Sequence, residues 1–419
     1  MPGYRALASD REFRALFTAH VVSVAGDQFA RVALTVHVYD RTASAGLTAL
    51  AYALTFLPDL IGGPLLSGLA DRFERKQVMV AADLVRAALL LLMAVPGLPL
   101  WALAAVVVLV QFAGAPHGAA RAALLPHVLP DERYPLGQAV MGTVTQAAQV
   151  AGFIAGGALV AWFGPALVLV ADAVTFGVSA FLLGVFLLDR PAPQRTHKRA
   201  WPTDLVGGTK LVWGDQRLRA LVALACVSGF YIVGEALAVP YAAHLGAGPA
   251  GVGMIFGAYA AGAAAGMLVV AHLPERLQLR LMPWLAIAAC AVLVPAALRP
   301  GLVVSVGMFA LSGAASAYHL VANTRFVRAV PDESRGQAFG LAVTALRVSQ
   351  GVGVALAGVA TETITVHRVV AAAGALGVLA AGGAAILWWL SDASRSDGPS
   401  QSDAASRSGE RDGRWRKRG

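Results

Sequence analysis

The chain has 419 residues, of which 57% are hydrophobic and only 14% are charged, and its formal net charge is +9 at pH 7. Its mean hydropathy of +0.65 lies far outside the range of soluble domains. The composition therefore indicates a membrane protein and argues against a soluble enzyme.

Long stretches without Asp, Glu, Lys or Arg mark the segments that cross the membrane. Each of the stretches 100–120, 245–273, 281–298 and 369–390 reaches or approaches the roughly 20 residues that span a bilayer as a helix. A helix satisfies its own backbone hydrogen bonds inside lipid. In chain order we expect twelve transmembrane helices, near residues 14–38, 47–69, 77–95, 99–120, 137–162, 165–188, 219–243, 250–272, 281–298, 302–323, 337–360 and 367–390.

A repeated motif relates the two halves of the chain. Pro-Asp-Glu followed by Gly-Gln-Ala occurs within residues 130–139 and again within 331–338, and an arginine precedes each copy. The Asp residues lie 332 − 131 = 201 positions apart and the first Gly residues 336 − 137 = 199, close to half of the chain. The pattern predicts an all-α membrane protein of two pseudo-symmetric six-helix halves.

Basic residues collect on one side of this expected topology. The N-terminus, the loops after spans 2, 4, 8 and 10, the middle segment and the C-terminal tail hold most Lys and Arg, whereas the other side holds Arg41, Arg299 and Arg368. Lys and Arg favour cytoplasmic loops, so we expect both termini in the cytoplasm and the protein in the plasma (inner) membrane. We attribute the net charge to topology and expect no nucleic-acid binding.

The same asymmetry defines the expected domain organisation. It consists of an N-terminal bundle at residues 1–188, a cytoplasmic linker at 189–218, a C-terminal bundle at 219–390 and a disordered cytoplasmic tail at 391–419. The linker is rich in Pro, Lys and Arg, and the tail is built of Ser, Asp, Gly and Arg. Such a tail buries too little apolar surface to fold.

The loop after the second span carries the most specific motif. It reads Ser67-Gly68-Leu69-Ala70-Asp71-Arg72-Phe73-Glu74-Arg75-Lys76. It resembles the Gly-x-Leu-x-Asp-Arg-x-Gly-Arg-Arg/Lys signature of the major facilitator superfamily, with Ser67 and Glu74 in place of the two glycines. Glu74, together with Asp83 and Arg86 in span 3, makes the chain similar to the drug-exporter branch that includes macrolide and siderophore exporters.

The resemblance implies a conformational role for this loop. In the family, such contacts latch the two halves in the outward-open state, and the matching residues here are Asp71, Arg72, Arg75, Lys76, Asp83 and Arg86. The alternative is that the loop charges only fix topology. For Asp83 and Arg86 we expect a network that braces the loop, because both lie near the cytoplasmic end of span 3.

Polar residues inside the spans are the better guide to mechanism, because a charge at mid-membrane is costly and usually faces a cavity or a partner. The resemblance places spans 1, 4, 7 and 10, with 2, 5, 8 and 11, around a central cavity. The candidate substrate-binding or proton-coupling residues are Asp27, Arg31, Gln146, Gln149, Glu235, His319, Asn323 and Arg347. Asp83, Arg86 and Asp172 lie in supporting spans and are expected to be structural.

Glu235 is the first candidate for a titrating acid, because no basic residue lies at helical spacing within its span. The alternative is a position near a water-filled mouth. Asp27 and Arg31 lie four residues apart on one helix face, which permits either a permanent ion pair or a coupling role for Asp27. Arg347 could hold an anionic substrate group or neutralise Asp27 across the halves.

No enzymatic pattern accompanies these residues. The sequence has neither metal-ligand spacing nor a phosphate-binding Gly-x-x-x-x-Gly-Lys-Ser/Thr loop, so we expect no catalysis, no metal and no cofactor. We expect a monomeric, proton-coupled exporter of a small amphipathic organic compound, such as a drug, a macrolide or a siderophore-like molecule, that works by alternating access in the lipid bilayer. Uptake of a nutrient or metabolite, and a non-transporting scaffold or receptor, are the alternatives.

Overall fold

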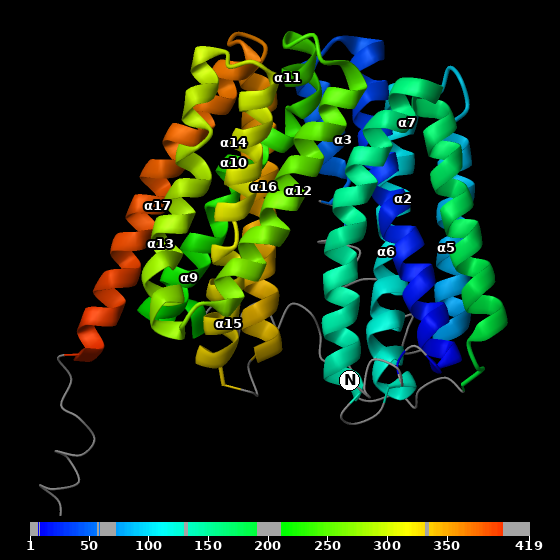
Figure 1. Ribbon diagram of the computed structural model, residues 1–419, viewed down its shortest axis with the longest axis horizontal. Helices are drawn as coiled ribbons and strands as arrows, with labels where there is room; N and C mark the ends of the chain where they lie inside the picture. The colour runs from blue at the N-terminus through cyan, green and yellow to red at the C-terminus, as the bar shows by residue number, and fades with distance from the viewer. Residues whose placement is uncertain are drawn as a thin grey trace, which may run out of the picture.

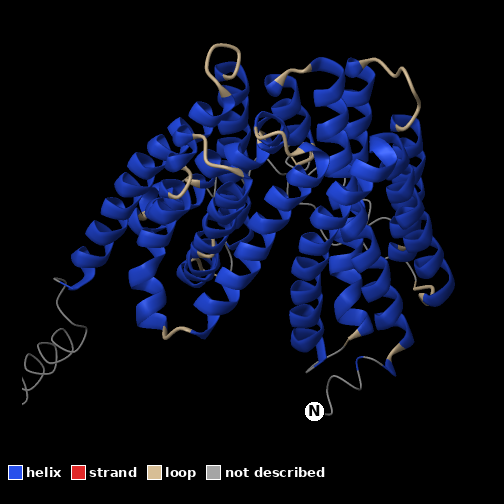
Figure 2. Ribbon diagram, turned by 45° about the horizontal axis from the view of Figure 1, so that its top comes forward, coloured by secondary structure: helices blue, strands red, loops and turns tan. Residues whose placement is uncertain are grey.

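The computed structural model describes residues 7, 9–56, 58, 73–129, 133–190, 211–331 and 335–396. Within these residues the regular elements are all helices, joined by loops and turns (Figure 2). The first long helix begins and the last one ends at the same end of the molecule (Figure 1). An even number of membrane crossings requires this arrangement.

The N-terminal half contains the helices α2 (Arg11–Thr42), α3 (Ala45–Leu54), α5 (Arg75–Met93), α6 (Leu100–Val128) and α7 (Arg133–Phe186). α7 is interrupted at Gly164, which has φ 78° and ψ 163°. Glycine tolerates this positive φ, and the following Pro165 has no N–H with which to continue the helix. The interruption separates the two predicted spans 137–162 and 165–188.

The C-terminal half contains the elements α9 (Gln216–Cys226), α10 (Ser228–Ala236), α11 (Ala238–His244), α12 (Gly248–His272), α13 (Glu275–Ala291), η2 (Val294–Leu298), α14 (Leu302–Ala315), α15 (Tyr318–Ala329), α16 (Arg335–Ala360) and α17 (Val366–Ser396). Three predicted spans are each divided into shorter helices: 219–243 into α9 to α11, 281–298 into α13 and η2, and 302–323 into α14 and α15.

Eight helical stretches in the described residues are long and apolar enough to cross a membrane. One of them, Leu136–Phe186, contains both spans of α7, so the eight stretches account for nine predicted spans. α2, α3 and α5 correspond to the other three, although the end of the predicted span 47–69 lies outside the described residues. The predicted all-α membrane fold is therefore confirmed. Residues 191–210 and 397–419 of the predicted linker and tail also lie outside that part.

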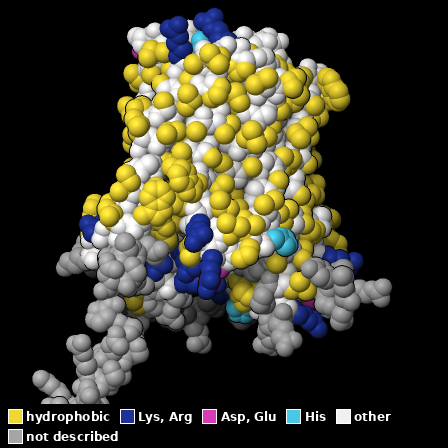
Figure 3. Space-filling model, turned by 60° about the vertical axis from the view of Figure 1, so that its left-hand side comes forward, with side chains coloured by type: hydrophobic (Ala, Val, Ile, Leu, Met, Phe, Trp, Pro, Cys, Tyr) yellow, Lys and Arg dark blue, Asp and Glu magenta, His cyan; other side chains and the backbone are white. Residues whose placement is uncertain are grey.

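The outer surface suits a lipid environment. Hydrophobic side chains cover the middle of the face drawn in Figure 3, and Lys and Arg gather near its two ends. Trp101, at the start of α6, and Trp162, just before the break in α7 at Gly164, are exposed. Tryptophan is enriched at membrane interfaces because its ring is apolar and its N–H is polar.

The two halves meet through close helix crossings. α7 packs against α12, and α3 packs against α16. A Cβ atom on Gly157 would lie 2.5 Å from Gly253 Cα, and one on Gly46 would lie 3.1 Å from the carbonyl oxygen of Gly358. Glycine allows such backbone approach. Both crossings lie toward the end opposite the termini, where α3 begins and α16 ends (Figure 1), so the halves touch at that end.

At the other end, Glu12 ties the start of α2 to the chain that follows α7. Its Oε1 accepts hydrogen bonds from the Leu188 amide and from Arg190 Nη1, both at 2.8 Å, and its Oε2 accepts from Arg190 Nη2 at 2.7 Å. The hydrogen bonds from the Arg190 guanidinium favour the ionised carboxylate and lower the pKa of Glu12 from its ordinary value.

We expect Glu12→Gln to lower thermal stability at neutral pH, and we expect its difference from the wild type to vanish in acid. A carboxyl group with a lowered native pKa contributes stability above its unfolded-state pKa, and this contribution is lost as the pH falls through the native pKa. The measurement is thermal unfolding in detergent from neutral pH to about pH 3. Glu74→Gln is the control, because Glu74 binds Gln77 at an exposed position. A pH-independent difference would contradict the prediction.

Candidate functional site

A cavity of about 720 Å³ lies between the two halves. Its walls come from α2, α3, α5, α6 and α7 on one side and from α10, α12 and α16 on the other. Five of the predicted coupling or binding residues line it, namely Asp27, Arg31, Gln149, Glu235 and Arg347. The volume lies in the range of pockets that bind drug-sized molecules.

Glu235 joins the two halves inside this cavity. Its Oε2 accepts a 2.6 Å hydrogen bond from the hydroxyl of Tyr52 on α3. Glu235 is only 6% exposed, and its Oε1 has no hydrogen-bond partner among the described residues. α10 ends at Ala236, directly after Glu235. Pro240 has no N–H to donate to the carbonyl oxygen of Ala236, and its ring would clash with that carbonyl in a continuous helix. This break positions the acid at a helix end.

Aromatic rings hold the partner of Glu235 in place. The Tyr52 ring stacks on Phe256 of α12 with the centroids 5.8 Å apart, and Phe256 stacks on Phe153 of α7 at 5.0 Å. The stack therefore alternates between the two halves. Because stacked rings resist reorientation, the Tyr52 hydroxyl stays directed toward Glu235 across the interface.

Two arginines from opposite halves share this part of the cavity. The Arg31 guanidinium lies 5.9 Å from the ring centroids of both Tyr52 and Phe153, and that of Arg347 lies 5.6 Å from Phe56. At such distances an aromatic face attracts a cation. The centre of the cavity thus combines one acid with two cations.

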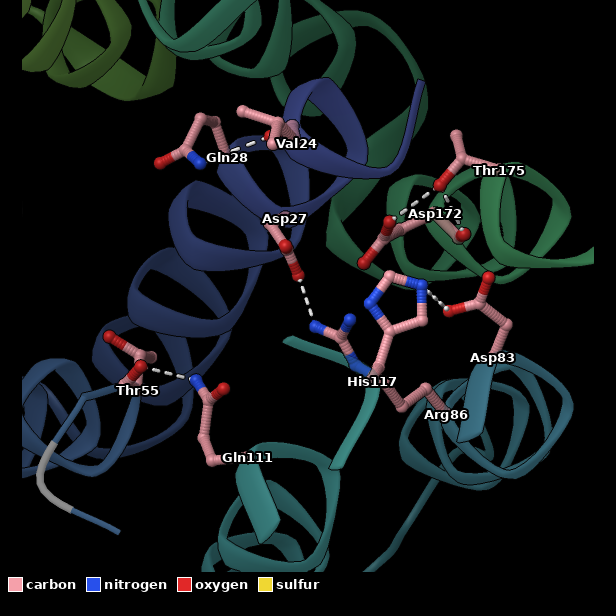
Figure 4. Close-up of polar contacts among 10 residues, drawn as sticks. All are labelled: Val24, Asp27, Gln28, Thr55, Asp83, Arg86, Gln111, His117, Asp172 and Thr175. Atoms are coloured by element: carbon pink, nitrogen blue, oxygen red, sulfur yellow. Dashed lines mark hydrogen bonds and ion pairs between the residues drawn. The ribbon is translucent and has the colours of Figure 1, made fainter. Parts of the chain in front are cut away.

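Asp27 forms its ion pair with Arg86 and not with Arg31, the partner that helical spacing permitted. Its Oδ1 accepts a 2.6 Å hydrogen bond from Arg86 Nη2 on α5 (Figure 4). No Asp27–Arg31 ion pair occurs among the described residues. Arg86 also lies 3.9 Å above the Phe176 ring. Spacing of four residues permits a pair but does not orient both side chains, and here α5 supplies the better-placed cation.

The same contacts correct the expected role of span 3. Arg86 was expected to brace the signature loop, yet its partner is Asp27 in the cavity wall. Asp83 accepts a 2.5 Å hydrogen bond from Ser179 of α7, and its Oδ1 lies 3.5 Å from His117 Nε2 of α6. Both side chains therefore face the interior of the N-terminal half.

The remaining candidates lie away from the cavity wall or outside the described part of the chain. Gln146 and His319 are half-buried and Asn323 is exposed, and none of the three lines the cavity described above. His319 Nε2 lies 2.7 Å from the hydroxyl of Tyr231 and so belongs to a packed polar contact. Asp71 and Arg72 of the expected latch lie outside the described residues.

The described part of the loop contacts its own half. Arg75 Nη1 donates to the carbonyl oxygen of Ala123 at 2.9 Å, and Lys76 Nζ lies 2.7 Å from Asp189 Oδ1. In the other half, Glu275 pairs with Arg325 at 2.6 Å and Arg328 at 3.0 Å. These ion pairs do not cross the interface, which agrees with halves that touch at the opposite end. The latch stays a prediction.

Several cavity residues were not anticipated as site residues. They are His20, Tyr52, Gln111, Arg121, Tyr259 and Gln350, together with Asp172, which was expected to be structural. Gln111 donates to the carbonyl oxygen of Thr55, and Arg121 contacts His20. Aromatic and amide residues are common in apolar helices, so the sequence held no signal that would separate Tyr52, Gln111, Tyr259 and Gln350 from packing residues. The ionisable side chains of His20, Arg121 and Asp172 were a signal that could have marked those three.

Taken together, a helical membrane fold of two halves around a polar, drug-sized cavity is that of a secondary transporter. The comparisons identify the family: residues 16–239 and 220–416 each match the Major Facilitator Superfamily. The chain belongs to this superfamily. The match falls into two stretches of the chain, which agrees with the internal repeat in the sequence.

Two relatives extend the comparison. The chain is 25% identical over 407 residues to an uncharacterized MFS-type transporter, YvqJ, of Bacillus subtilis, an alignment that covers 92% of this chain and 94% of the relative. It is 29% identical over 126 residues to macrolide efflux protein A of Streptococcus pyogenes, covering 29% of this chain and 31% of that protein.

Solved transporters share the fold. A POT family transporter in complex with 5-aminolevulinic acid aligns with a TM-score of 0.73 at 9% identity, covering 90% of this chain and 96% of that chain. The nucleoside transporter NupG aligns with a TM-score of 0.69 at 14% identity, covering 90% and 98%. A bacterial homologue of Spinster, in an inward-facing conformation, aligns with a TM-score of 0.64 at 14% identity, covering 92% and 96%.

Proposed function

We propose that the protein exports a small amphipathic organic compound from the cytoplasm in exchange for protons, as a monomer in the plasma membrane with both termini in the cytoplasm. The observation that carries the proposal is the buried Glu235, whose carboxylate binds Tyr52 of the other half inside the cavity. The partial similarity to a macrolide efflux protein supports export. The excess of basic residues at the end that holds the termini supports the orientation.

The Glu235–Tyr52 contact offers a direct link between protonation and conformation. An ionised carboxylate accepts a hydrogen bond about twice as strongly as a neutral group. Protonation of Glu235 would therefore weaken a contact that joins the halves, and loss of the proton would restore it. This dependence is what exchange of a proton for a substrate in alternating access requires.

The cavity also suits an amphipathic compound. Aromatic residues from both halves, including Phe56 and Tyr259, line the cavity together with Gln111, Gln149 and Gln350. Rings provide contact area for an apolar body, and a few amide and charged groups orient the polar part of a ligand. The cavity is large enough to enclose such a molecule between the two halves.

A second candidate function is uptake of an anionic metabolite together with protons. Four arginines line the cavity, namely Arg31, Arg86, Arg121 and Arg347, against three carboxylates, Asp27, Asp172 and Glu235. An excess of guanidinium groups attracts anions, and protonation of Glu235 would strengthen that attraction, so that anion and proton would bind together. A scaffold without transport is disfavoured, because buried charges are costly and nothing would offset the cost.

Flux in proteoliposomes tests the proposal. The purified protein is reconstituted with a pH-sensitive dye inside the vesicles, and macrolides, amphipathic cations and amphipathic carboxylates are added in turn. Export by exchange predicts that substrate and protons move in opposite directions, whereas uptake of an anion predicts movement in the same direction. A protein that moves neither with any compound in the panel would contradict transport coupled to protons.

A further inference from the structure

A cluster of ionisable side chains lies inside the N-terminal half, apart from Glu235. Asp27 comes from α2, Asp83 and Arg86 from α5, His117 from α6 and Asp172 from α7 (Figure 4). Asp83 is 0% exposed and Asp172 is 1% exposed. With all three carboxylates ionised and the imidazole neutral, the charge would be −3 + 1 = −2. A buried site does not sustain such an excess without compensation.

The single arginine is committed to one of the three acids. Arg86 Nη2 binds Asp27 Oδ1 at 2.6 Å, and the guanidinium carbon lies over Phe176, 3.9 Å from the ring centroid. The other two acids receive hydrogen bonds from neutral hydroxyl groups: Ser179 donates to Asp83 at 2.5 Å, and Thr175 donates to Asp172 Oδ1 at 2.9 Å. A hydroxyl donor offsets only part of the cost of burying a carboxylate.

Three atoms of the cluster are shielded from solvent and lack a hydrogen-bond partner in the described part of the chain. They are Asp172 Oδ2, Asp83 Oδ1 and His117 Nε2. The last two lie 3.5 Å apart, slightly beyond hydrogen-bond length. A proton between these two atoms would turn a near contact into a hydrogen bond, and a proton on Asp172 would remove a buried charge. Each of these three atoms can therefore accept a proton or share one with its neighbour.

The neighbouring helix α2 packs closely against Asp172 and leaves little space beside its carboxyl group. Gly26 of α2 packs directly on it, and a Cβ atom at that position would collide with Asp172 Oδ1 and Thr175 Oγ1. The charged and titratable groups that face the region are Asp27 and His20 from α2, Asp83 and Arg86 from α5, and His117 and Arg121 from α6. Asp172 and His117 also line the cavity, so protons can reach both from its water.

We propose that this cluster is a second proton-binding site, in which Asp172 holds one proton and the Asp83–His117 pair holds another. Two protons cancel the charge of −2, so the site is neutral when both are bound. Its part in transport rests on the proposed proton coupling, and it implies that more than one proton is available per cycle. Asp83 and Asp172 lie in spans that were expected to be structural, whereas Asp27 and His117 lie in spans that were expected to line the cavity.

Infrared spectroscopy of the purified protein tests the site without any substrate. The carbonyl stretch of a protonated carboxylic acid is separate from the stretches of a carboxylate, so buried protonated acids can be counted. We expect the wild type to show such a band at neutral pH, Asp172→Asn to lose part of it, and Asp83→Asn to lose a further part. Asp215→Asn is the matched control, because Asp215 caps α9 with hydrogen bonds from backbone amides and should contribute nothing.

A milder variant keeps the test decisive if an Asn variant does not fold. Thr175→Val removes the hydroxyl that donates to Asp172, so the protonated band should persist to higher pH than in the wild type. Superimposable wild-type, Asp172→Asn and Thr175→Val spectra at every pH would overturn the proposal. The spectra do not depend on flux: a band that Asp172→Asn reduces, without proton-coupled flux, would refute the proposed function alone, and coupled flux with a band that neither Asp172→Asn nor Thr175→Val changes would refute the second site alone.

Discussion

Glu235→Gln is expected to abolish the pH dependence of transport while leaving expression and folding intact. Glutamine has nearly the same shape and can still accept the hydrogen bond from Tyr52, so the contact between the halves survives in a form that no longer responds to pH. Because the proton is then no longer exchanged at this position, we expect proton-driven flux to fall at least about tenfold. This corresponds to an increase of about 1.4 kcal/mol in the activation free energy of transport.

The measurement compares initial rates of flux in proteoliposomes across a pH series. Glu275→Gln is the matched control, because Glu275 forms exposed ion pairs with Arg325 and Arg328 at the end of the molecule and does not line the cavity. It should retain the wild-type profile. If Glu235→Gln kept the wild-type pH profile, Glu235 would have no part in coupling. Tyr52→Phe separates the roles further: it should alter the profile without removing it, since the acid remains.

The positions of the helices could be predicted from the sequence because they depend on local composition. Apolar runs and the repeat of Gly-Gln-Ala each report on a short stretch of chain. Where a span breaks was not predicted. The division at Leu237 within the predicted span 219–243 follows from Pro240, which has no N–H for the carbonyl of Ala236, and the division at Val227 lies in an apolar stretch that hydropathy does not separate from its neighbours.

The partners of the site residues could not be predicted in the same way. Glu235 was chosen as a candidate because it lacks a basic neighbour in its own helix, but its bond to Tyr52 joins residues 183 positions apart. Asp27 shows the opposite case: Arg31 has the right spacing, yet Arg86, 59 positions away, forms the ion pair. Spacing along one helix reports on its face, whereas these contacts depend on how separate helices rotate against one another.

Asp172 illustrates the limit of assigning roles by helix number. The resemblance placed its span among the supporting helices, and the second segment of α7 does lie beside α2 and α5. Its side chain nevertheless reaches the cavity, because Gly26 leaves no side chain between α2 and α7 at that level. A supporting helix can therefore contribute an acid to the cavity wall wherever a neighbouring glycine gives it room.

Gly157→Leu is expected to disfavour the conformation in which the halves touch at the end opposite the termini. The Cβ atom at Gly157 would lie 2.5 Å from Gly253 Cα and 2.9 Å from the carbonyl oxygen of Pro249. These are backbone atoms of α12, which cannot turn aside as a side chain can. Overpacking of this kind costs about 1–3 kcal/mol, and since each 1.4 kcal/mol is tenfold, the population of this conformation should fall by about 5-fold to 150-fold.

Spin labels at the loops of that end provide the measurement. Pro96, between α5 and α6, and Gly301, before α14, lie on different halves and carry the labels as cysteines in a background without Cys226 and Cys290. Double electron-electron resonance should show the label distance lengthening in Gly157→Leu, and the flux should fall because the cycle cannot return through the closed interface. Gly177→Leu, in the second segment of α7, is the matched control, since a Cβ atom there meets nothing within 4 Å. An unchanged distance distribution in Gly157→Leu, together with normal flux, would show that this crossing does not separate during transport.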